Sequence, residues 1–186
     1  MDYASPMDTF ETARLRMRPL DAADEALYCA LYTTPALMRF IAAPLSPEAA
    51  RRSFQSALRN SSPRPQRWSV FEKHDDHKLG MLGLIGDDDR PEIGVMLLSH
   101  AHGRGLGTEA MQGLVDHAFN AYSLRSICAR QQVVDNPTVI RMMTRVGFKA
   151  LPSNAERPEG GDWELHRSDW QALSSRIAVA GAPGSR

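Results

Sequence analysis

The stretch 92–110 constrains the fold most, because a short apolar run leads through three glycines directly into a long helical pattern. The run at 93–98 has the character of a buried strand. Gly103, Gly105 and Gly107 lack a Cβ atom, so the backbone there can adopt unusual angles and a ligand can approach it closely. The unpaired N–H groups and the dipole at a helix start attract anions. This stretch therefore predicts a strand, a tight loop and a helix N-terminus that can hold phosphate.

Two familiar nucleotide-binding patterns do not fit this glycine loop. It contains no Gly-Lys-Ser/Thr, which excludes a P-loop, and its glycines are out of register for a dinucleotide fingerprint. Taken alone, the loop is equally consistent with a basic turn that only caps a helix.

The composition indicates one globular domain. The chain has 186 residues, 42% of them hydrophobic, which is enough for a real core. Lys+Arg and Asp+Glu are both 22, and this balance argues against a general nucleic-acid binder. We expect an N-terminal lead at 1–11, a single domain at 12–173, and a disordered tail at 174–186, where small residues and glycines accumulate.

The cysteines and the lack of targeting signals predict a cytoplasmic protein. Cys29 and Cys128 lie far apart and have no motif around them, as expected for thiols in a reducing compartment. No apolar run reaches membrane-spanning length, and no signal peptide is visible in residues 1–10. His74 and His77 flank an acidic turn, which we interpret as a polar hairpin tip, and we expect no metal.

Hydrophobic periodicity predicts an alternation of strands and helices. The expected elements are strand 12–20, helices 21–33, 35–41 and 46–59, strands 68–72, 79–85 and 92–98, helix 107–122, strand 126–134, helix 137–146, and strands 148–151 and 162–167. This order predicts an α+β fold, in which helices flank a mostly antiparallel, twisted mixed sheet.

Several segments in one consistent order resemble a known family. Glu92-Ile93-Gly94 and the run Arg104-Gly-Leu-Gly-Thr-Glu-Ala110 resemble the acetyl-CoA-binding core of the Gcn5-related N-acetyltransferases (GNAT). The segments 135–137 (Asp-Asn-Pro) and 145–148 (Arg-Val-Gly-Phe) resemble its branch of ribosomal-protein N-terminal acetyltransferases (RimJ/RimL-like). The same branch is suggested by 68–70, 80–83 and 167–170, so the likeness spans about residues 12–170.

The resemblance implies how acetyl-CoA would be held. The strands that carry Glu92 and Arg130 would splay apart to admit the pantetheine arm. Loop amides would grip the pyrophosphate, and a backbone N–H at a bulge near Met96 or Leu97 would polarise the thioester carbonyl. The residues expected at the cofactor are Met96, Leu97, Leu98, His102, Gly103, Arg104, Gly105, Leu106, Gly107, Thr108, Asn136 and Arg141. His102 stands where the family usually has Gln or Arg.

Glu92 and Asn136 are the expected catalytic residues. An amine is protonated at neutral pH, and Glu92 would accept its proton directly or through a water. The alternatives are that Glu92 caps the turn or pairs with Arg90, and that Asn136 only caps a helix. Val139 and Met143 occupy the places where relatives carry a proton-donating Ser or Tyr.

The resemblance also implies that the first two helices form one wall of the acceptor site. Tyr28, Tyr32, Arg39 and Phe40 are the candidates to touch the acceptor, although aromatics at this spacing are typical of a core. The predicted function is transfer of acetyl from acetyl-CoA to a primary amine, either a protein N-terminus or a small metabolite or antibiotic. The alternative is an acyl-CoA sensor with little turnover. We expect no nucleic-acid or membrane partner, and a homodimer is left open.

Overall fold

A computed structural model of the protein describes residues 8–59, 66–86, 89–131, 136–152 and 161–180. Its strands are β1 (Phe10–Glu11), β2 (Leu15–Pro19), β3 (Arg67–Glu72), β4 (Lys78–Ile85), β5 (Glu92–Leu97), β6 (Ser126–Gln131), β7 (Lys149–Ala150) and β8 (Gly161–His166). Its helices are α1 (Glu25–Thr33), α2 (Pro35–Met38), α3 (Pro47–Arg59), α4 (Leu106–Ala121), α5 (Pro137–Val146) and α6 (Arg167–Ala180), with 3-10 turns at Ala22–Asp24 and Ser99–Ala101.

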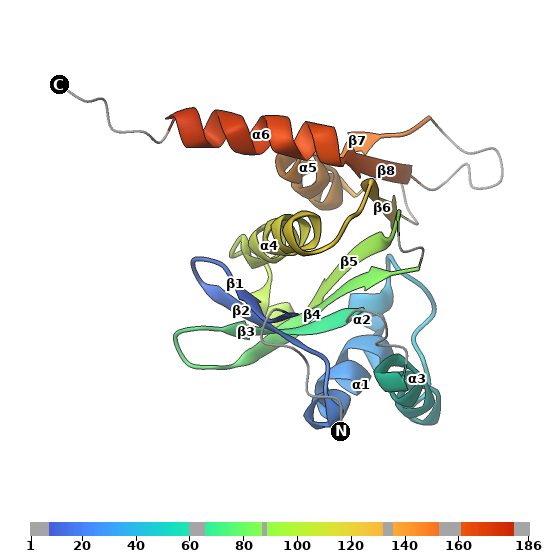
Figure 1. Cartoon of the computed structure of the whole chain (residues 1–186). Coiled ribbons are helices and arrows are strands. Elements are labelled where there is room, and N and C mark those ends of the chain that lie inside the picture. The colour runs from blue at the N-terminus through green and yellow to red at the C-terminus, as the bar shows by residue number, and fades with distance from the viewer. Residues whose placement is uncertain (1–7, 60–65, 87–88, 132–135, 153–160, 181–186) are drawn as a thin grey trace.

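The strands form one eight-stranded sheet in the order β1-β2-β3-β4-β5-β6-β8-β7. All neighbouring strands are antiparallel except β5 and β6, which are parallel. Helices α1, α2 and α3 lie on one side of the sheet and α4 and α5 on the other (Figure 1). This arrangement confirms the predicted fold class.

Strands β5 and β6 separate almost as soon as they meet. Their ladder contains a single pair, Glu92 with Cys128. On its other side, β5 pairs continuously with β4, from Glu92 opposite Ile85 to Leu97 opposite Gly80. The predicted splay is therefore present.

The predicted bulge near Met96 or Leu97 is absent from the β4–β5 ladder, which has no register shift. Gly80 explains the unbroken pairing, because a Cβ atom there would lie 2.1 Å from the Met96 carbonyl oxygen. Its lack of a side chain lets the two backbones stay in register. The irregularity lies in β3 instead, between Val70 and Phe71.

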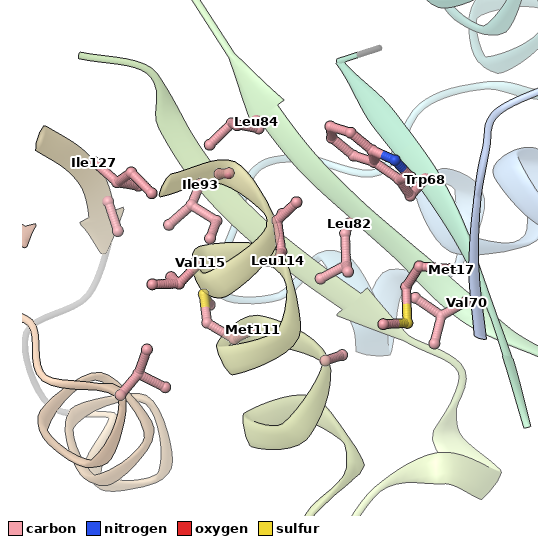
Figure 2. Packing of buried hydrophobic residues seen from close by; sticks show 14 of the residues in the cluster. Met17, Trp68, Val70, Leu82, Leu84, Ile93, Met111, Leu114, Val115 and Ile127 are labelled. Atoms are coloured by element: carbon pink, nitrogen blue, oxygen red, sulfur yellow. The ribbon is translucent and has the colours of Figure 1, made fainter. Parts of the chain in front are cut away.

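Two apolar clusters cover the two faces of the sheet. Met111, Leu114 and Val115 of α4 lie at helical spacing and pack on the sheet, near Leu82 and Ile93 (Figure 2). The cluster on the opposite face comprises Leu27, Tyr28, Leu31, Phe54, Ala57 and Met81. Helices α1 and α3 are thereby held against β4, and the gap between β5 and β6 lies next to both clusters.

Arg167, the first residue of α6, ties the end of α4 to the chain that follows it. Its guanidinium donates to the carbonyl oxygens of Phe119 at 2.7 Å, Tyr122 at 2.6 Å and Leu124 at 2.8 Å. The last carbonyls of a helix have no partner within the helix. Arg167 therefore supplies hydrogen-bond donors to carbonyl groups at the end of α4 and just after it.

Asp24 is the most buried carboxylate among the described residues, and it links the α1 region to the sheet. Its Oδ1 lies 2.7 Å from Lys78 Nζ and 3.0 Å from Arg18 Nη2, and its Oδ2 accepts from the Asp21 N–H at 3.0 Å. Burial alone would raise the pKa of Asp24. Hydrogen bonds from Lys78, Asp21 and Arg18 outweigh burial, so its pKa lies below the usual range.

The two ends of the domain differ from the prediction. Phe10–Glu11, placed in the N-terminal lead, pairs with Met17 and Arg16 as strand β1. The tail predicted to begin at 174 is wrong up to Ala180, because α6 continues to that residue. No glycine or proline interrupts 167–180, and Leu173 packs against Gly147 at the end of α5. Residues 181–186 and 132–134 lie outside the described residues.

None of the described helices combines the length and apolar character needed to cross a membrane.

Candidate active site

A cavity of about 800 Å³ opens where β5 and β6 separate. Its lining comes from both faces of the sheet. Met111 and Met143 line it on the α4–α5 side, and Tyr32 and Met81 line it on the α1–α3 side. The cavity therefore joins the two sides of the sheet at this gap.

Glu92 lies at the start of β5 and lines this cavity. Side chains alternate along a strand, so Glu92 shares the α1–α3 face with Met96, which packs in the cluster of that face. Glu92 Oε2 lies 2.8 Å from Arg130 Nε. The carboxylate has about 37% of its side-chain surface exposed, so it remains accessible from the cavity.

The partner of Glu92 is not the one considered from the sequence. Arg90 pairs instead with Glu164, with 2.6 Å between Arg90 Nε and Glu164 Oε1. The parallel register explains the exchange, because Glu92 lies beside Cys128 and Arg130 follows two residues later on the same face. The alternative pairing of Glu92 with Arg90 is wrong.

Cys128 lines the cavity beside Glu92. Its Sγ lies 3.5 Å from the carbonyl oxygen of Pro91. Burial raises the pKa of the Cys128 thiol, and the neighbouring Glu92 acts in the same direction. The thiol is therefore protonated at neutral pH.

The glycine loop forms the predicted turn into α4. Gly103 has φ 72° and Gly105 has φ 76°, in the left-handed region that favours glycine. Gly105 is the N-cap, and no side chain caps the helix. The first helical bond back to the loop runs from the Glu109 N–H to the Gly105 carbonyl at 3.2 Å. The three preceding N–H groups, at 106–108, have no acceptor within the helix.

The absence of a side-chain cap on α4 bears on Thr108. Thr108, one of the expected cofactor residues, does not cap this helix with its side chain. Its hydroxyl is left for the binding role implied by the resemblance.

Arg14 holds the loop against the sheet. Its Nε lies 2.6 Å from Glu109 Oε2 in the first turn of α4, and its Nη1 donates to the Arg104 carbonyl at 3.0 Å. The Arg104 guanidinium pairs with Glu72 of β3, with 3.1 Å between Nη1 and Oε2. Arg104 thus has a carboxylate partner in this conformation. His102 Nε2 bonds to the Leu97 carbonyl at 2.8 Å, which ties the loop to the end of β5.

The glycine loop does not line the cavity, but it lies beside a residue that does. A Cβ atom on Gly107 would lie 3.6 Å from Leu97 Cδ1 and 4.0 Å from Met142 Sδ. Met142 of α5 does line the cavity. The N-terminus of α4 therefore sits beside the passage between β5 and α5.

The predicted cofactor residues fall into two groups. Met96 and Asn136 line the cavity. The others lie outside the lining: Leu97, Leu98, His102, Gly103, Arg104, Gly105, Leu106, Gly107, Thr108 and Arg141. Arg141 is exposed in the second turn of α5, and its Nη2 lies 3.4 Å from Thr138 Oγ1.

Asn136 caps α5, as the simpler interpretation predicted. Its Oδ1 accepts from the N–H groups of Thr138 at 3.2 Å and Val139 at 3.4 Å. Asn136 also lines the cavity, so the cap does not remove it from the site. Val139 and Met143 line the cavity too, and neither side chain can donate a proton.

Comparison with known proteins decides the family. The family model of the acetyltransferase (GNAT) domain matches residues 14–149. The chain belongs to the GNAT acetyltransferase family. It is 26% identical over 149 residues to the uncharacterized N-acetyltransferase p20 of Bacillus licheniformis, covering 77% of this chain and 83% of that protein.

Solved GNAT structures share the fold. One is a spermidine N-acetyltransferase from Vibrio cholerae in complex with CoA and spermine, with a TM-score of 0.73, 15% identity, and coverage of 86% of this chain and 99% of that one. Another is the ribosomal alpha-N-protein acetyltransferase RimL in complex with coenzyme A, with a TM-score of 0.70, 17% identity, and coverage of 85% and 97%. Because both match comparably, the ribosomal branch is not singled out within the GNAT family.

The α1–α2 region of this GNAT domain brings two of the four predicted acceptor residues to the cavity, Tyr32 and Phe40. Tyr28 is buried, stacks on Tyr32 with 4.3 Å between ring centroids, and has its hydroxyl 2.8 Å from Ser53 Oγ. Its position is that of a core residue. Arg39 is exposed over the Phe40 ring, 4.2 Å from its centroid, and does not line the cavity.

Arg67 is a charged lining residue that the sequence did not reveal. It is the first residue of β3 and follows a proline-bearing loop without a motif. Its Nε is buried and has no hydrogen-bond partner. Only the pairing of Arg67 with Gly83, and of Gly83 with Gly94, brings it to the face that carries Glu92.

Proposed function

We propose that this GNAT protein transfers the acetyl group of acetyl-CoA to a primary amine bound on the α1–α3 side of the cavity. Bound acetyl-CoA would supply the activated acetyl thioester. The observation that carries the proposal is the cavity itself, which joins the two faces of the sheet beside Glu92. A donor that approaches from α4 and α5 and an acceptor that approaches from α1 and α2 would meet there.

The residues around the α4 N-terminus suit a pyrophosphate. The free N–H groups at 106–108 and the helix dipole favour an anion at this point. Arg141, exposed in the second turn of α5, is the expected side-chain partner of the phosphates in this proposal. Arg104 would first have to exchange Glu72 for a phosphate, so it contributes only after that ion pair opens.

The strand alternation supports Leu97 as the donor to the thioester carbonyl. The Leu98 N–H donates to the Leu79 carbonyl at 2.8 Å, so the even-numbered residues of β5 direct their backbone groups to β4. The N–H of Met96 is therefore used within the sheet. The N–H of Leu97 points to the side where β6 has separated, and there it can stabilise negative charge on an oxygen.

Glu92 is the residue that we propose as general base. Arg130 holds one carboxylate oxygen, Oε2, which leaves Oε1 to accept a proton from the amine or from an intervening water. Val139 and Met143 cannot protonate the departing sulfur. A thiol has an ordinary pKa of about 8.5, so a thiolate can leave without a dedicated acid.

The acceptor is a primary amine of a protein N-terminus or of a small molecule in this proposal. We also propose a cytoplasmic location, which the two free thiols support. One observation favours an acyl-CoA sensor as a second candidate, namely the lack of a proton donor at Val139 and Met143. A sensor would bind acetyl-CoA and release little thiol.

The test measures release of coenzyme A thiol from acetyl-CoA with a panel of amines. We expect turnover in the wild type and a fall in kcat of about 100-fold or more in Glu92→Gln. Because the amine itself deprotonates at high pH, the difference in kcat between Glu92→Gln and the wild type should become smaller there. Glu48→Gln, on the exposed start of α3, is the matched control.

Equal rates and equal pH profiles for Glu92→Gln and the wild type would remove Glu92 from the mechanism. If acetyl-CoA raises the melting temperature but no amine in the panel causes release of its thiol, the protein is the sensor instead.

A further inference from the structure

We infer that the acceptor is an amine that also carries a carboxylate, which Arg67 binds while the amine lies at Glu92. This inference rests on the proposed acetyl transfer and narrows its acceptor class. Two observations support it: Arg67 lines the cavity, and the sheet surface between Arg67 and Glu92 is formed by glycines.

Among the residues that the structure describes, Arg67 has no counter-ion. Three arginines line the cavity, and two of them are paired: Arg90 with Glu164 and Arg130 with Glu92. No carboxylate of the described residues forms an ion pair with Arg67, and its Nε is buried without a hydrogen-bond partner. A buried charged donor left unpaired is costly, and the guanidinium fork matches a carboxylate in two parallel hydrogen bonds. An anionic ligand would satisfy it.

Tyr32 does not neutralise this cation. It lies beside Arg67 and lines the same part of the cavity. Burial raises the pKa of Tyr32, the adjacent Tyr28 adds to that effect, and Arg67 acts in the opposite direction. The phenol is therefore neutral at physiological pH, and the positive charge of Arg67 remains available to a ligand.

The sheet surface between Arg67 and Glu92 is built on glycines, although the flexible Ile85 side chain would lie 3.2 Å from a Cβ atom on Gly83. Arg67 pairs with Gly83, and Gly83 pairs with Gly94, so two glycines lie across the adjacent strands on this face. A Cβ atom on Gly94 would have no heavy atom within 4 Å. Two strand spacings and two residues along β5 put the Arg67 and Glu92 Cα atoms about 12 Å apart. A short chain can lie across this floor.

The groove therefore has opposite charges at its two ends and apolar walls. Leu37, Phe40 and Ile41 line it from the α2 region. A carboxylate at Arg67 and an ammonium group at Glu92 would each meet a complementary charge, with the methylenes between them over the glycine floor. A plain alkylamine would leave Arg67 unsatisfied.

The experiment compares straight-chain ω-amino acids, from glycine to 6-aminohexanoate, with the alkylamines of matching length. We expect kcat/KM to peak at one chain length and to exceed that of the matching alkylamine. Arg67→Gln should lower kcat/KM for the best amino acid about 10- to 100-fold more than kcat/KM for the matching alkylamine. Arg67→Lys should recover part of the loss, because it keeps the charge and loses the fork.

The control is Arg59→Gln, which removes the same charge from the exposed end of α3 and should leave the amino-acid preference intact. Equal use of amino acids and alkylamines, or an unchanged preference in Arg67→Gln, would overturn the inference and leave acetyl transfer standing. No heat with acetyl-CoA and no thiol release with any amine would overturn the proposed function. If acetyl-CoA binds without turnover, calorimetry of 4-aminobutyrate with wild type and Arg67→Gln decides the role of Arg67 alone, and equal affinities would overturn it.

Discussion

Gly107→Ala should stabilise the free protein while weakening its hold on acetyl-CoA. Gly107 is in the first turn of α4, and an added Cβ atom would lie 3.6 Å from Leu97 Cδ1 and 4.0 Å from Met142 Sδ. Both distances are ordinary van der Waals contacts. Glycine in a helix costs 0.5–1 kcal/mol relative to alanine. We therefore expect a gain of about 0.5–1 kcal/mol and a rise in Tm of about 1–4 °C.

The same methyl group stands in the path of the cofactor. It would fill space between β5 and α5, beside Met142, which lines the cavity. If a phosphate approaches the amides at 106–108, the methyl group should cost at least one charge-assisted hydrogen bond. One such bond corresponds to a loss of affinity of about tenfold or more.

Gly113→Ala is the matched control, because it makes the same change in the same helix. Its Cβ atom would lie 2.5 Å from Thr12 Cγ2 and 3.3 Å from Met17 Cε, so it should overpack the contact with the sheet. We expect a loss of about 1–3 kcal/mol of stability with affinity for acetyl-CoA retained. Urea denaturation and calorimetry measure the two quantities. An unchanged Kd in Gly107→Ala would show that the pyrophosphate does not lie on this turn.

Three further substitutions test the scaffold and the loop. Arg167→Ala should lower the free energy of unfolding by about 3 kcal/mol, because three hydrogen bonds to backbone carbonyls are lost. The control is Arg125→Ala. A urea midpoint for Arg167→Ala no lower than that of the control would show that these hydrogen bonds do not stabilise the fold. Because the folded pKa of Asp24 is depressed, its contribution is present above its unfolded pKa and is lost as pH falls through the folded pKa. Asp24→Asn should therefore be less stable than wild type near pH 7, with the gap closing in acid, and a gap constant with pH in urea titrations would refute this. Glu72→Gln should release Arg104 and tighten acetyl-CoA binding in calorimetry, and weaker binding would show that the ion pair orders the loop instead.

Local features of the chain were predictable from the sequence. The glycine loop, its left-handed residues and the helix after it depend on neighbouring residues, so their spacing was enough to predict them. The cap at Asn136 is local in the same way. The short strand β1 was missed because two residues carry no periodicity, and α6 was not predicted because the small residues after 173 suggested a disordered tail.

Ion pairs at the site could not be predicted from the sequence, because the register between neighbouring strands determines which charged residues lie side by side. Arg90 is close to Glu92 in sequence, yet it pairs with Glu164 of β8, and Glu92 pairs with Arg130 of β6. Both outcomes follow from which residue of β6 lies opposite Glu92. No spacing rule within one segment contains that information.

The roles of the glycines in the sheet also depend on strand pairing, and for this reason Arg67 could not be predicted as a site residue from the sequence. Gly80 is required for the close approach of β5, whereas Gly94 has open space above it and the Cβ position of Gly83 lies 3.2 Å from the flexible Ile85 side chain. In the sequence these three glycines look alike. Only the pairing of β3, β4 and β5 shows that two of them clear a path from Arg67 to Glu92. Filling that path with Gly94→Val should therefore impair the acceptor more than acetyl-CoA, raising KM for the amine while Kd for acetyl-CoA stays constant.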